Sequence, residues 1–334
     1  MASSTSSANP IRFDAPTTIG IDVGGTKILG VVIEGSKVVA KNLNPTPKDP
    51  TKVAAAIGDA VSDLLDEFGA VGGVGVGLPG LVDYGGVLQY GPNVPGVVGL
   101  NIVDYLKQGL GLEAVASNDA SCAALAEHRL GAARGYEHAV IVTQGTGIGG
   151  GLIVNNGILR GANGFAGEPG HMLIDRRGEM CACGTRGCWE AVASGAGLAN
   201  IARSLVEEGR AETILGFADG ISDHIRGEHV AQALQGGDAD AREVVKRFSW
   251  WVAQGLASLI TLLDPGVVVL GGGLTALSDQ FIPDIQRQVA SSVMGGAHRP
   301  EVPVVAAELG PEAGAVGAAL LAQQDSYPRS VDTV

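Results

Sequence analysis

The residues with the most distinctive spacing in this chain lie in the loop 170–190. Its cysteines follow the pattern C-x-C-x4-C, and a histidine stands ten residues before the first of them. Three thiolates and one imidazole complete the four-coordinate shell of a structural zinc site and leave no position open for a catalytic water. Free or redox-active thiols are the alternatives, although a redox pair normally has the spacing C-x-x-C. We predict one structural Zn²⁺ per chain, bound by His171, Cys181, Cys183 and Cys188.

Two glutamates, Glu168 and Glu190, stand close to the two ends of this loop. Glu168 lies in the glycine-flanked segment G-E-P-G-H, and Glu190 comes two residues after the last cysteine of the pattern. A carboxylate can accept hydrogen bonds from two hydroxyls, as a polyhydroxylated ligand such as a sugar requires. Two solvated surface acids are the alternative interpretation. With the zinc holding the loop in shape, we predict that both carboxylates contact a sugar.

Glycine-rich loops provide candidates for phosphate binding. Glycine lets backbone N–H groups approach phosphate oxygens closely, and threonine hydroxyls add donors. No loop has the Walker pattern, the dinucleotide-like spacing in 145–150 runs into a strand instead of a helix, and a plain tight turn is the alternative for each loop alone. Together they favour a nucleotide, with Asp22 as an indirect partner of Mg²⁺ and Lys27 at a phosphate or in solvent. The candidates are Asp22, Gly24, Gly25, Thr26, Lys27, Gly145, Thr146, Gly147, Gly149, Gly150, Gly271, Gly272 and Gly273.

A further polar pair, Asn118-Asp119, follows the apolar run E-A-V-A-S and precedes a helical pattern. Helix capping explains such a pair on local grounds. A carboxylate at the end of a strand could instead serve as general base for a hydroxyl. Both interpretations stay open at the level of local sequence.

Composition limits the function classes. The chain has 334 residues, 52 glycines, 46% hydrophobic and 4% aromatic residues, and a formal net charge of −13. This acidic balance disfavours nucleic acid and anionic membranes as partners. The first residues are small and polar, without the basic and apolar regions of a secretory signal, and no apolar run reaches membrane-spanning length. We expect a cytoplasmic protein with no nucleic-acid or membrane partner.

The organisation of the chain indicates an α/β fold with an internal duplication. Segments 18–40 and 139–160 share one plan of strand, glycine loop, strand, turn and strand. Helical spacing predicts a helix over 53–68 that ends at Gly69, a helix from 118 or 119, an all-round apolar and therefore buried helix over 248–263, and a small-residue helix over 313–322. We predict a disordered tail at 1–16, a small lobe from 17–121 plus about 312–325, a larger lobe with the zinc loop at 122–311, and a loose tail at 326–334.

Together these motifs resemble the ROK group of sugar kinases and regulators in the actin–hexokinase superfamily, and most of all its bacterial ATP-dependent glucokinases. The resemblance extends from about residue 18 to 322. Its motifs are I-G-I-D-V-G-G-T-K, L-P-G, S-N-D-A, T-Q-G-T-G-I-G-G-G-L, G-E-P-G-H, C-A-C-G-T-R-G-C-W-E and V-V-L-G-G-G. It implies two lobes of the actin/hexokinase-like (ribonuclease-H-like) fold with a cleft between them, and a homodimer or homotetramer.

The resemblance also implies residue roles. Asp119 is the expected catalytic base that takes the proton from the 6-hydroxyl of glucose as this hydroxyl attacks the γ-phosphate of ATP. The glycine loops are expected to bind the phosphates and the adenosine. His171 is expected to link the zinc with the sugar site. The expected sugar contacts are Asn93, Asn118, Asp119, Glu168, His171 and Glu190.

The chain departs from the family pattern at Val97, where many relatives carry Trp after N-x-P-G, which bears on Asn93 as a sugar contact. The alternatives to a glucokinase are a kinase for mannose, fructose or an N-acetyl sugar, and a polyphosphate-using glucokinase. A sugar-sensing regulator is a remote alternative, because the residues before Thr18 lack the pattern of a DNA-binding helix-turn-helix.

Overall fold

The computed structural model describes residues 17–274 and 278–323. The chain forms two compact units, and each is built from separate stretches of sequence. The first comprises Met1–Glu137, Gly151–Gly167 and Pro311–Val334, and the second comprises His138–Gly150 and Glu168–Gly310. None of the helices in the described ranges combines the length and the apolar character needed to cross a bilayer.

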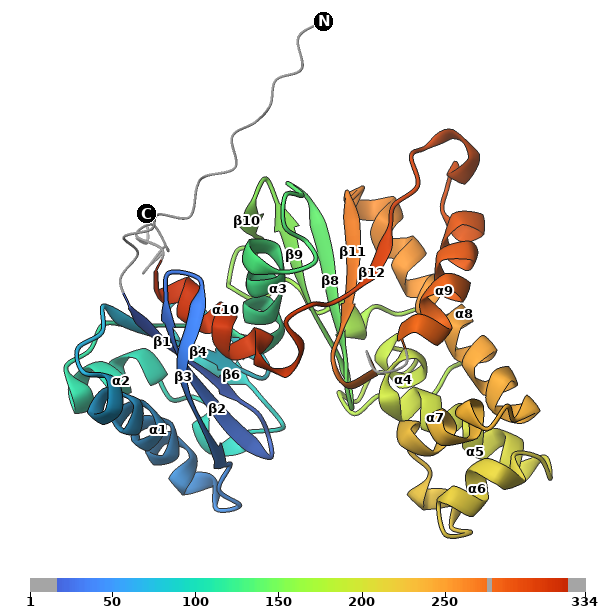
Figure 1. Ribbon diagram of the computed structural model, residues 1–334, viewed down its shortest axis with the longest axis horizontal. Helices are drawn as coiled ribbons and strands as arrows, with labels where there is room; N and C mark the ends of the chain where they lie inside the picture. Colours follow the sequence, from blue (N-terminus) through green and yellow to red (C-terminus); the bar gives the residue numbers. More distant parts are fainter. Residues whose placement is uncertain (1–16, 275–277, 324–334) are drawn as a thin grey trace, which may run out of the picture. The chain divides into compact units, whose positions relative to one another are not determined.

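The first unit contains a five-stranded sheet with the order β3-β2-β1-β4-β7 (Figure 1). Strands β1 and β2 and strands β2 and β3 pair antiparallel, whereas β4 pairs parallel with both β1 and β7. A two-stranded ribbon, β5-β6, follows β4. The strands are β1 Thr18–Val23, β2 Lys27–Glu34, β3 Lys37–Pro45, β4 Gly73–Leu78, β5 Leu81–Val82, β6 Leu88–Tyr90 and β7 Ala114–Asn118.

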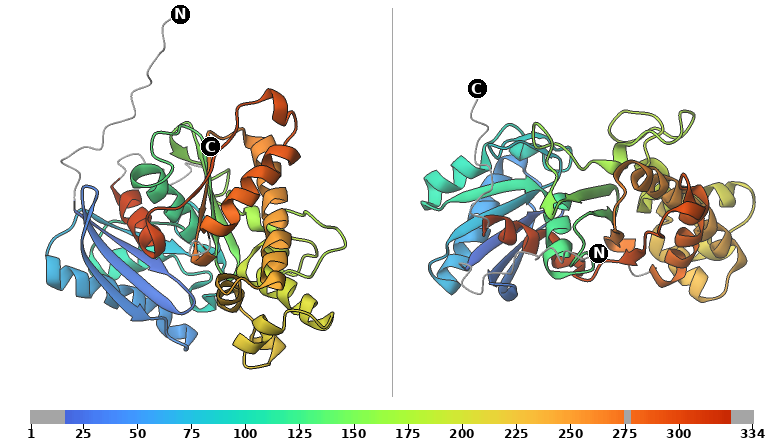
Figure 2. Two further views of the ribbon diagram at one scale, coloured as in Figure 1. Left: turned by 45° about the vertical axis from the view of Figure 1, so that its right-hand side comes forward. Right: turned by 90° about the horizontal axis from the view of Figure 1, so that it is seen from above.

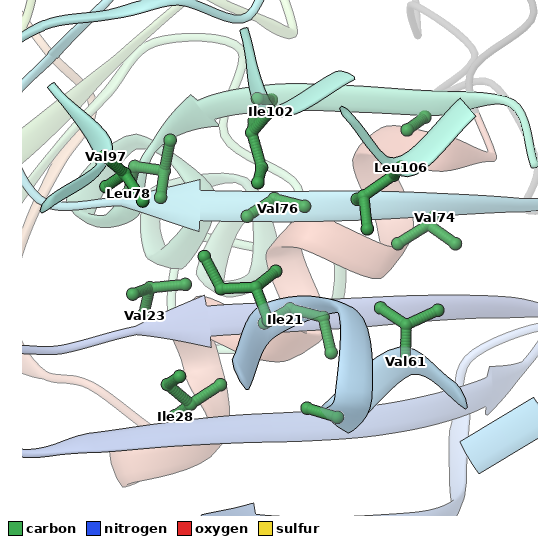
Figure 3. Close-up of a cluster of buried hydrophobic side chains, with 14 of the residues drawn as sticks. Ile21, Val23, Ile28, Val61, Val74, Val76, Leu78, Val97, Ile102 and Leu106 are labelled. Atoms are coloured by element: carbon green, nitrogen blue, oxygen red, sulfur yellow. The ribbon is translucent and has the colours of Figure 1, made fainter. Parts of the chain in front are cut away.

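Helices cover both faces of this sheet. Alternate residues of β1 and β4 point to one face, where they form an apolar core with α1 (Val53–Phe68) and α2 (Ile102–Leu110). Figure 3 shows Ile21, Val76 and Ile102 in this core. The predicted helix over 53–68 is confirmed, with its end at Gly69. The other face of the sheet carries α3 (Asp119–Leu130) and α10 (Ala313–Ala322), and the predictions of both helices are confirmed.

The second five-stranded sheet has the order β10-β9-β8-β11-β12. Its strand order matches that of the first sheet position by position. An antiparallel hairpin, β9-β10, forms one edge, and on the other side β11 pairs parallel with both β8 and β12. The predicted duplication is therefore confirmed at the level of topology. The strands are β8 Ala139–Gln144, β9 Ile148–Val154, β10 Gly157–Ile158, β11 Val267–Gly271 and β12 Val304–Ala306.

The remaining helices belong to the second unit, where α8 and α9 pack against each other (Figure 2). The predicted buried helix over 248–263 is the last part of a longer helix. Its burial is incomplete, because Trp250 is 46% exposed and Leu262 is 78% exposed. The prediction of an all-round buried helix is wrong for this face. The helices are α4 Glu190–Ala193, α5 Gly195–Glu207, α6 Glu212–Phe217, α7 Gly227–Gln235, α8 Ala239–Leu263 and α9 Ser278–Ser292.

The two units divide the chain differently from the predicted lobes. Helix α3 and residues 151–167 belong to the first unit, whereas the sequence-based division places them in the larger lobe. The reason is the packing of α3 against α10, which is close enough that a Cβ on Gly317 would overlap the carbonyl oxygen of Cys122.

The contact between α10 and the first sheet generates a prediction. A Cβ on Gly75 of β4 would overlap the carbonyl oxygen of Ala318, so Gly75→Ala must move backbone against backbone. Overpacking of this kind costs typically about 1–3 kcal/mol. We expect Gly75→Ala to lower the free energy of unfolding by at least that amount in denaturant titration. Gly109→Ala in α2 is the matched control, because no atom lies within 4 Å of its added Cβ. An equal effect of both substitutions would contradict the packing argument.

Candidate functional site

Two candidate carboxylates lie at the carboxyl ends of β1 and β7, the two strands that flank β4 in the first unit. Asp22 pairs with Gly77 across β1 and β4, and Leu78 pairs with Asn118 across β4 and β7. A Cβ on Gly77 would lie 3.4 Å from the Cα of Asp119. Only the narrow glycine strand β4 therefore separates Asp22 from Asp119, and the structure brings together two residues that stand 97 positions apart in the chain.

Both carboxylates are half-buried, and their surroundings oppose ionisation. Burial and the charge of Asp119 raise the pKa of Asp22 to about 7, and the opposite charge of Lys27 acts against this shift. Burial also raises the pKa of Asp119, against the hydrogen bond that the backbone N–H of Ala120 donates to its Oδ1 at 2.8 Å. A pair of carboxyl groups with pKa values raised toward neutrality is typical of sites that move protons.

The first turn of α10 lies against Asp22. A Cβ on Gly314 would stand 2.8–3.0 Å from the carboxyl atoms of Asp22, so this position of the helix accepts only glycine while Asp22 keeps its place. Local sequence gives no sign of this contact, since Gly314 reads simply as one of several small residues in the helix.

Asn118 is the N-cap of α3, as the capping interpretation of this pair predicts. Its Oδ1 accepts a hydrogen bond from the backbone N–H of Ser121 at 2.9 Å, and its Nδ2 donates to the carbonyl oxygen of Gly80 at 3.1 Å. The side chain thus joins the strand end, the helix start and the L-P-G turn. Asp119 comes next, at the first helical position.

The first glycine loop is the turn of the β1–β2 hairpin. The backbone N–H of Gly24 donates to the carbonyl oxygen of Lys27 at 2.9 Å, and the loop is fixed from outside by Thr46, whose hydroxyl donates to the Gly24 carbonyl oxygen. Gly25, Thr26 and Lys27 are exposed. A Cβ on Gly25 would lie 3.4 Å from the carbonyl oxygen of Asn93, so this predicted sugar contact stands beside the loop.

The second glycine loop, 145–150, comprises the turn between β8 and β9 and the first three residues of β9, all in the second unit. Its turn is closed by a hydrogen bond from the N–H of Gly145 to the carbonyl oxygen of Gly147 at 2.9 Å. The end of β11 lies next to it, because Gly271 pairs with Thr143. The structure therefore brings the predicted phosphate loop and the predicted adenosine loop 271–273 together. Thr146, Gly272 and Gly273 are exposed, as ligand contact requires.

Glu190 connects this loop with the cysteines. Its Oε2 accepts a hydrogen bond from the N–H of Ile148 at 2.8 Å, and its Oε1 accepts one from the Sγ of Cys181 at 3.3 Å. A Cβ on Gly147 would overlap the Oε2 of Glu190. This contact explains why the second glycine of G-T-G has no side chain. The carboxylate predicted to contact sugar is thus also a structural link between two motifs.

His171 is the last residue of a short 3₁₀ helix, Pro169–His171, and Glu168 is the residue just before this helix. The carbonyl oxygen of Glu168 accepts a hydrogen bond from the N–H of His171 at 3.2 Å. This turn packs on the second glycine loop, where a Cβ on Gly150 would lie 2.5 Å from the Cγ of Pro169. Glu168 is half-buried and His171 is exposed.

The four predicted zinc ligands form one cluster. Their donor atoms all lie within 4.8 Å of one another. The Sγ atoms of Cys183 and Cys188 are 3.7 Å apart, and the Sγ of Cys181 is 3.9 Å from the Nδ1 of His171. Donors placed tetrahedrally about 2.0–2.3 Å from a zinc ion are separated by roughly 3.3–3.8 Å, so the spacing and the donor chemistry both suit Zn²⁺.

Trp189 is a residue of the zinc loop to which the sequence analysis gave no role. It is fully buried, its Nε1 donates to the carbonyl oxygen of Trp251 at 2.9 Å, and its ring fills the space left by Gly255 in α8. This side chain fixes the end of the loop to the longest helix of the second unit. The glycine within an otherwise apolar helical run is the sequence signal that could have indicated it.

The predicted site residues thus form two sets, each assembled within its own unit. Asp22, the first glycine loop, Asn93 and Asn118-Asp119 belong to the first. The second glycine loop, loop 271–273, Glu168, Glu190 and the Cys₃His cluster belong to the second.

Comparison with known proteins shows that nearly the whole chain matches one protein family. The sequence pattern of the ROK family matches residues 18–325. A glucokinase of Streptomyces coelicolor is 37% identical over 316 residues, which cover 92% of this chain and 98% of that protein. An N-acetylmannosamine kinase of Escherichia coli is 31% identical over 92% of this chain and 98% of that protein.

The similarity extends to solved structures. A ROK family glucokinase from Streptomyces griseus, crystallised with glucose and AMPPNP, superposes with a TM-score of 0.82 at 36% identity. The alignment covers 92% of this chain and 99% of that one. The predicted actin/hexokinase-like fold is confirmed by this match.

The Cys₃His cluster generates a prediction about metal content. We expect purified protein to contain about one zinc per chain by elemental analysis, because three thiolates and an imidazole form a complete site. Cys183→Ser should lose the metal and lower the melting temperature, since metal binding contributes folding free energy. Cys122→Ala is the matched control, because this buried cysteine stands outside the cluster. Metal-free protein with an unchanged melting temperature would contradict the assignment.

The raised pKa of Asp22 generates a prediction about stability. In the unfolded chain this carboxyl loses its proton near 3.8, and in the folded chain near 7, so folding becomes less favourable as the pH rises between these values. Asn does not ionise, so Asp22→Asn avoids the cost of a buried negative charge at high pH. We expect this variant to melt at least about 2 °C above wild type at pH 8, with a smaller difference at pH 4.

The exposed Asp59 of α1 supplies the control for this experiment. Thermal scans of Asp59→Asn, without added metal or nucleotide, should follow wild type at both pH values. A melting temperature of Asp22→Asn that falls relative to wild type as the pH rises would show that the carboxylate form stabilises the fold.

Proposed function

The chain belongs to the ROK family, and from this membership we propose that it is a sugar kinase that transfers the γ-phosphoryl group of ATP to the 6-hydroxyl of glucose. The observation that carries the proposal is the position of Asp119, a half-buried carboxylate with a raised pKa at the end of β7. General bases work best when their pKa lies near the working pH. The raised pKa of Asp119 moves it in that direction.

In the proposed reaction, Asp119 accepts the proton of the 6-hydroxyl while the hydroxyl oxygen forms a bond to the γ-phosphorus. The bond between this phosphorus and the β–γ bridging oxygen breaks, and ADP leaves with the electron pair. Phosphoryl transfer of this kind depends mainly on positioning and charge stabilisation. Mg²⁺ bound near Asp22 would supply positive charge to the phosphate oxygens. The two glycine loops, which are exposed at residues 25–27 and at Thr146, provide the phosphate contacts in this proposal.

We assign the sugar hydroxyls to Asn118, Glu168, His171 and Glu190, with Asn93 as a further contact, and the adenosine to 271–273. In this proposal the zinc has a structural role, because its four ligands leave no open position. Glucose is the proposed main substrate because the glucokinase of Streptomyces coelicolor is the more similar of the two relatives described above.

The similarity to an N-acetylmannosamine kinase supports a second candidate, an N-acetyl hexosamine substrate for the same reaction. A coupled assay with glucose, mannose, fructose and N-acetylmannosamine, each with ATP or polyphosphate, separates these possibilities. The highest kcat/KM should belong to glucose with ATP. A higher value for another pair would transfer the proposal to that substrate or donor, and no turnover of any hexose would refute the kinase proposal.

The role of Asp119 generates a prediction about turnover. Asp119→Asn keeps the size of the side chain and an oxygen for the N–H of Ala120, but removes the proton acceptor. We expect kcat to fall about 10²–10⁴-fold, with glucose binding by calorimetry retained. Asp104→Asn, which alters an exposed carboxylate in the first turn of α2, is the matched control and should keep wild-type kcat. Near-normal turnover of folded Asp119→Asn would exclude the assignment.

A further inference from the structure

A buried arginine lies close to the candidate site in the first unit. Arg160 lies two residues after the end of β10 and is 6% exposed. Its guanidinium carbon stands 4.4 Å from the centroid of the Tyr84 ring. Its Nη2 lies 3.4 Å from the carbonyl oxygen of Asp83 and 3.4 Å from that of Ala116. A cation over an aromatic face and beside carbonyl oxygens is a stabilised arrangement.

Burial of a charge needs a reason, because taking a guanidinium out of water is energetically unfavourable. A methionine or leucine would fill similar space without that cost. The planar guanidinium has one property that these side chains lack, since it can donate to backbone carbonyl oxygens, here to two of them through Nη2, while its plane lies over an aromatic ring. The three segments that Arg160 joins therefore indicate what the buried arginine does.

Two of these segments meet at Asn118. Ala116 lies in β7, two residues before Asn118, and Asp83 follows β5 in the segment 80–84. The Nδ2 of Asn118 donates to the carbonyl oxygen of Gly80 in that same segment. Arg160 and Asn118 thus hold one turn from its two ends, and Asp119 is the next residue of the chain.

The third segment is the loop 160–167, which leads directly into Glu168. The N–H of Ala166 donates to the carbonyl oxygen of Arg160 at 3.0 Å, and the hydroxyl of Tyr84 donates to that of Gly161 at 2.6 Å. A Cβ on Gly164 would lie 2.6 Å from the carbonyl oxygen of Val82. The loop is therefore packed on the segment that Tyr84 and Arg160 share.

We propose that Arg160, together with Tyr84, is a positioning residue for hexose binding. It fixes the strand end that carries Asn118-Asp119 and the loop that precedes Glu168, and it contacts neither the sugar nor the reacting atoms. The inference rests on the proposed function, because it takes these residues as sugar contacts. Loss of Arg160 then weakens hexose binding selectively and leaves the nucleotide loops 22–27 and 145–150 in place.

The main test compares Arg160→Met with wild type in steady-state kinetics. We expect the KM for glucose to rise about tenfold or more, because small displacements of binding groups have effects of this size. The KM for ATP should stay within about twofold of wild type, since the side-chain contacts of Arg160 described above involve the segments 80–84 and 114–118 and not the phosphate loops. Arg160→Lys keeps the charge without the planar fork and should lie between wild type and Arg160→Met. Arg134→Met, at an exposed arginine of the same unit, is the matched control.

Tyr84 gives an independent measurement, which also decides the matter if Arg160→Met does not fold. Tyr84→Phe keeps the ring beneath the guanidinium and loses only the hydrogen bond to Gly161, whereas Tyr84→Leu loses both. We expect the KM for glucose to rise more in Tyr84→Leu than in Tyr84→Phe. An unchanged glucose KM in folded Arg160→Met or Tyr84→Leu overturns the proposal. An equal rise of both KM values, together with a lower melting temperature, assigns the arginine a general structural role and also overturns it.

A readout without activity separates this proposal from the proposed function. Hydrogen exchange measured by mass spectrometry should show faster exchange over 161–167 in Arg160→Met than in Arg134→Met. If wild type phosphorylates no hexose, the kinase proposal fails, and the exchange data alone judge whether Arg160 fixes this loop. Unchanged exchange over 161–167 overturns the positioning role whatever the kinetics show.

Discussion

Direct backbone contact between α10 and the strands β1 and β4 is the constraint on which the first unit depends. Glycines on the sheet and on the helix remove the side chains that normally separate the two layers. The close approach places the first turn of α10 against Asp22 and presses the helix onto α3, whose first residue is Asp119. The nearness of the two carboxylates is therefore a consequence of glycine placement, and it does not require any direct bond between them.

The second unit is organised by a different device. Here one carboxylate, that of Glu190, receives a hydrogen bond from the second glycine loop and another from a cysteine of the metal cluster. Because the buried ring of Trp189 fixes the neighbouring residue to α8, the glutamate has little freedom. A zinc-bound Cys181 is a thiolate and has no proton to donate to Glu190. A zinc ion would restrain Glu190 through the chain instead, because it would fix Cys188, two residues before the carboxylate that accepts the hydrogen bond from the second glycine loop.

The parts of this structure that sequence predicted are those determined by local pattern. The helix 53–68, the hairpins and the Cys₃His cluster follow from periodicity, turn residues and spacing within short windows. The allocation of α3 to the first unit, the contact of Gly314 with Asp22 and the burial of Arg160 depend on segments between about 40 and 290 residues apart, which no local window contains. The exposed Trp250 shows that local pattern also fails to predict burial, because an apolar run indicates a helix without indicating which of its faces is covered.

Interaction between Asp22 and Asp119 makes their protonation a property of the pair. Burial raises the pKa of each, and the charge of Asp119 raises that of Asp22 further, so at neutral pH the pair disfavours two simultaneous negative charges. A divalent cation beside Asp22 would replace this repulsion by attraction and favour the ionised form of Asp119, the form that can accept a hydroxyl proton. On the proposed function, binding of the metal-bound donor would therefore favour the competent form of the base. The same electrostatics that lowers the stability of the empty protein thereby links proton acceptance to nucleotide binding.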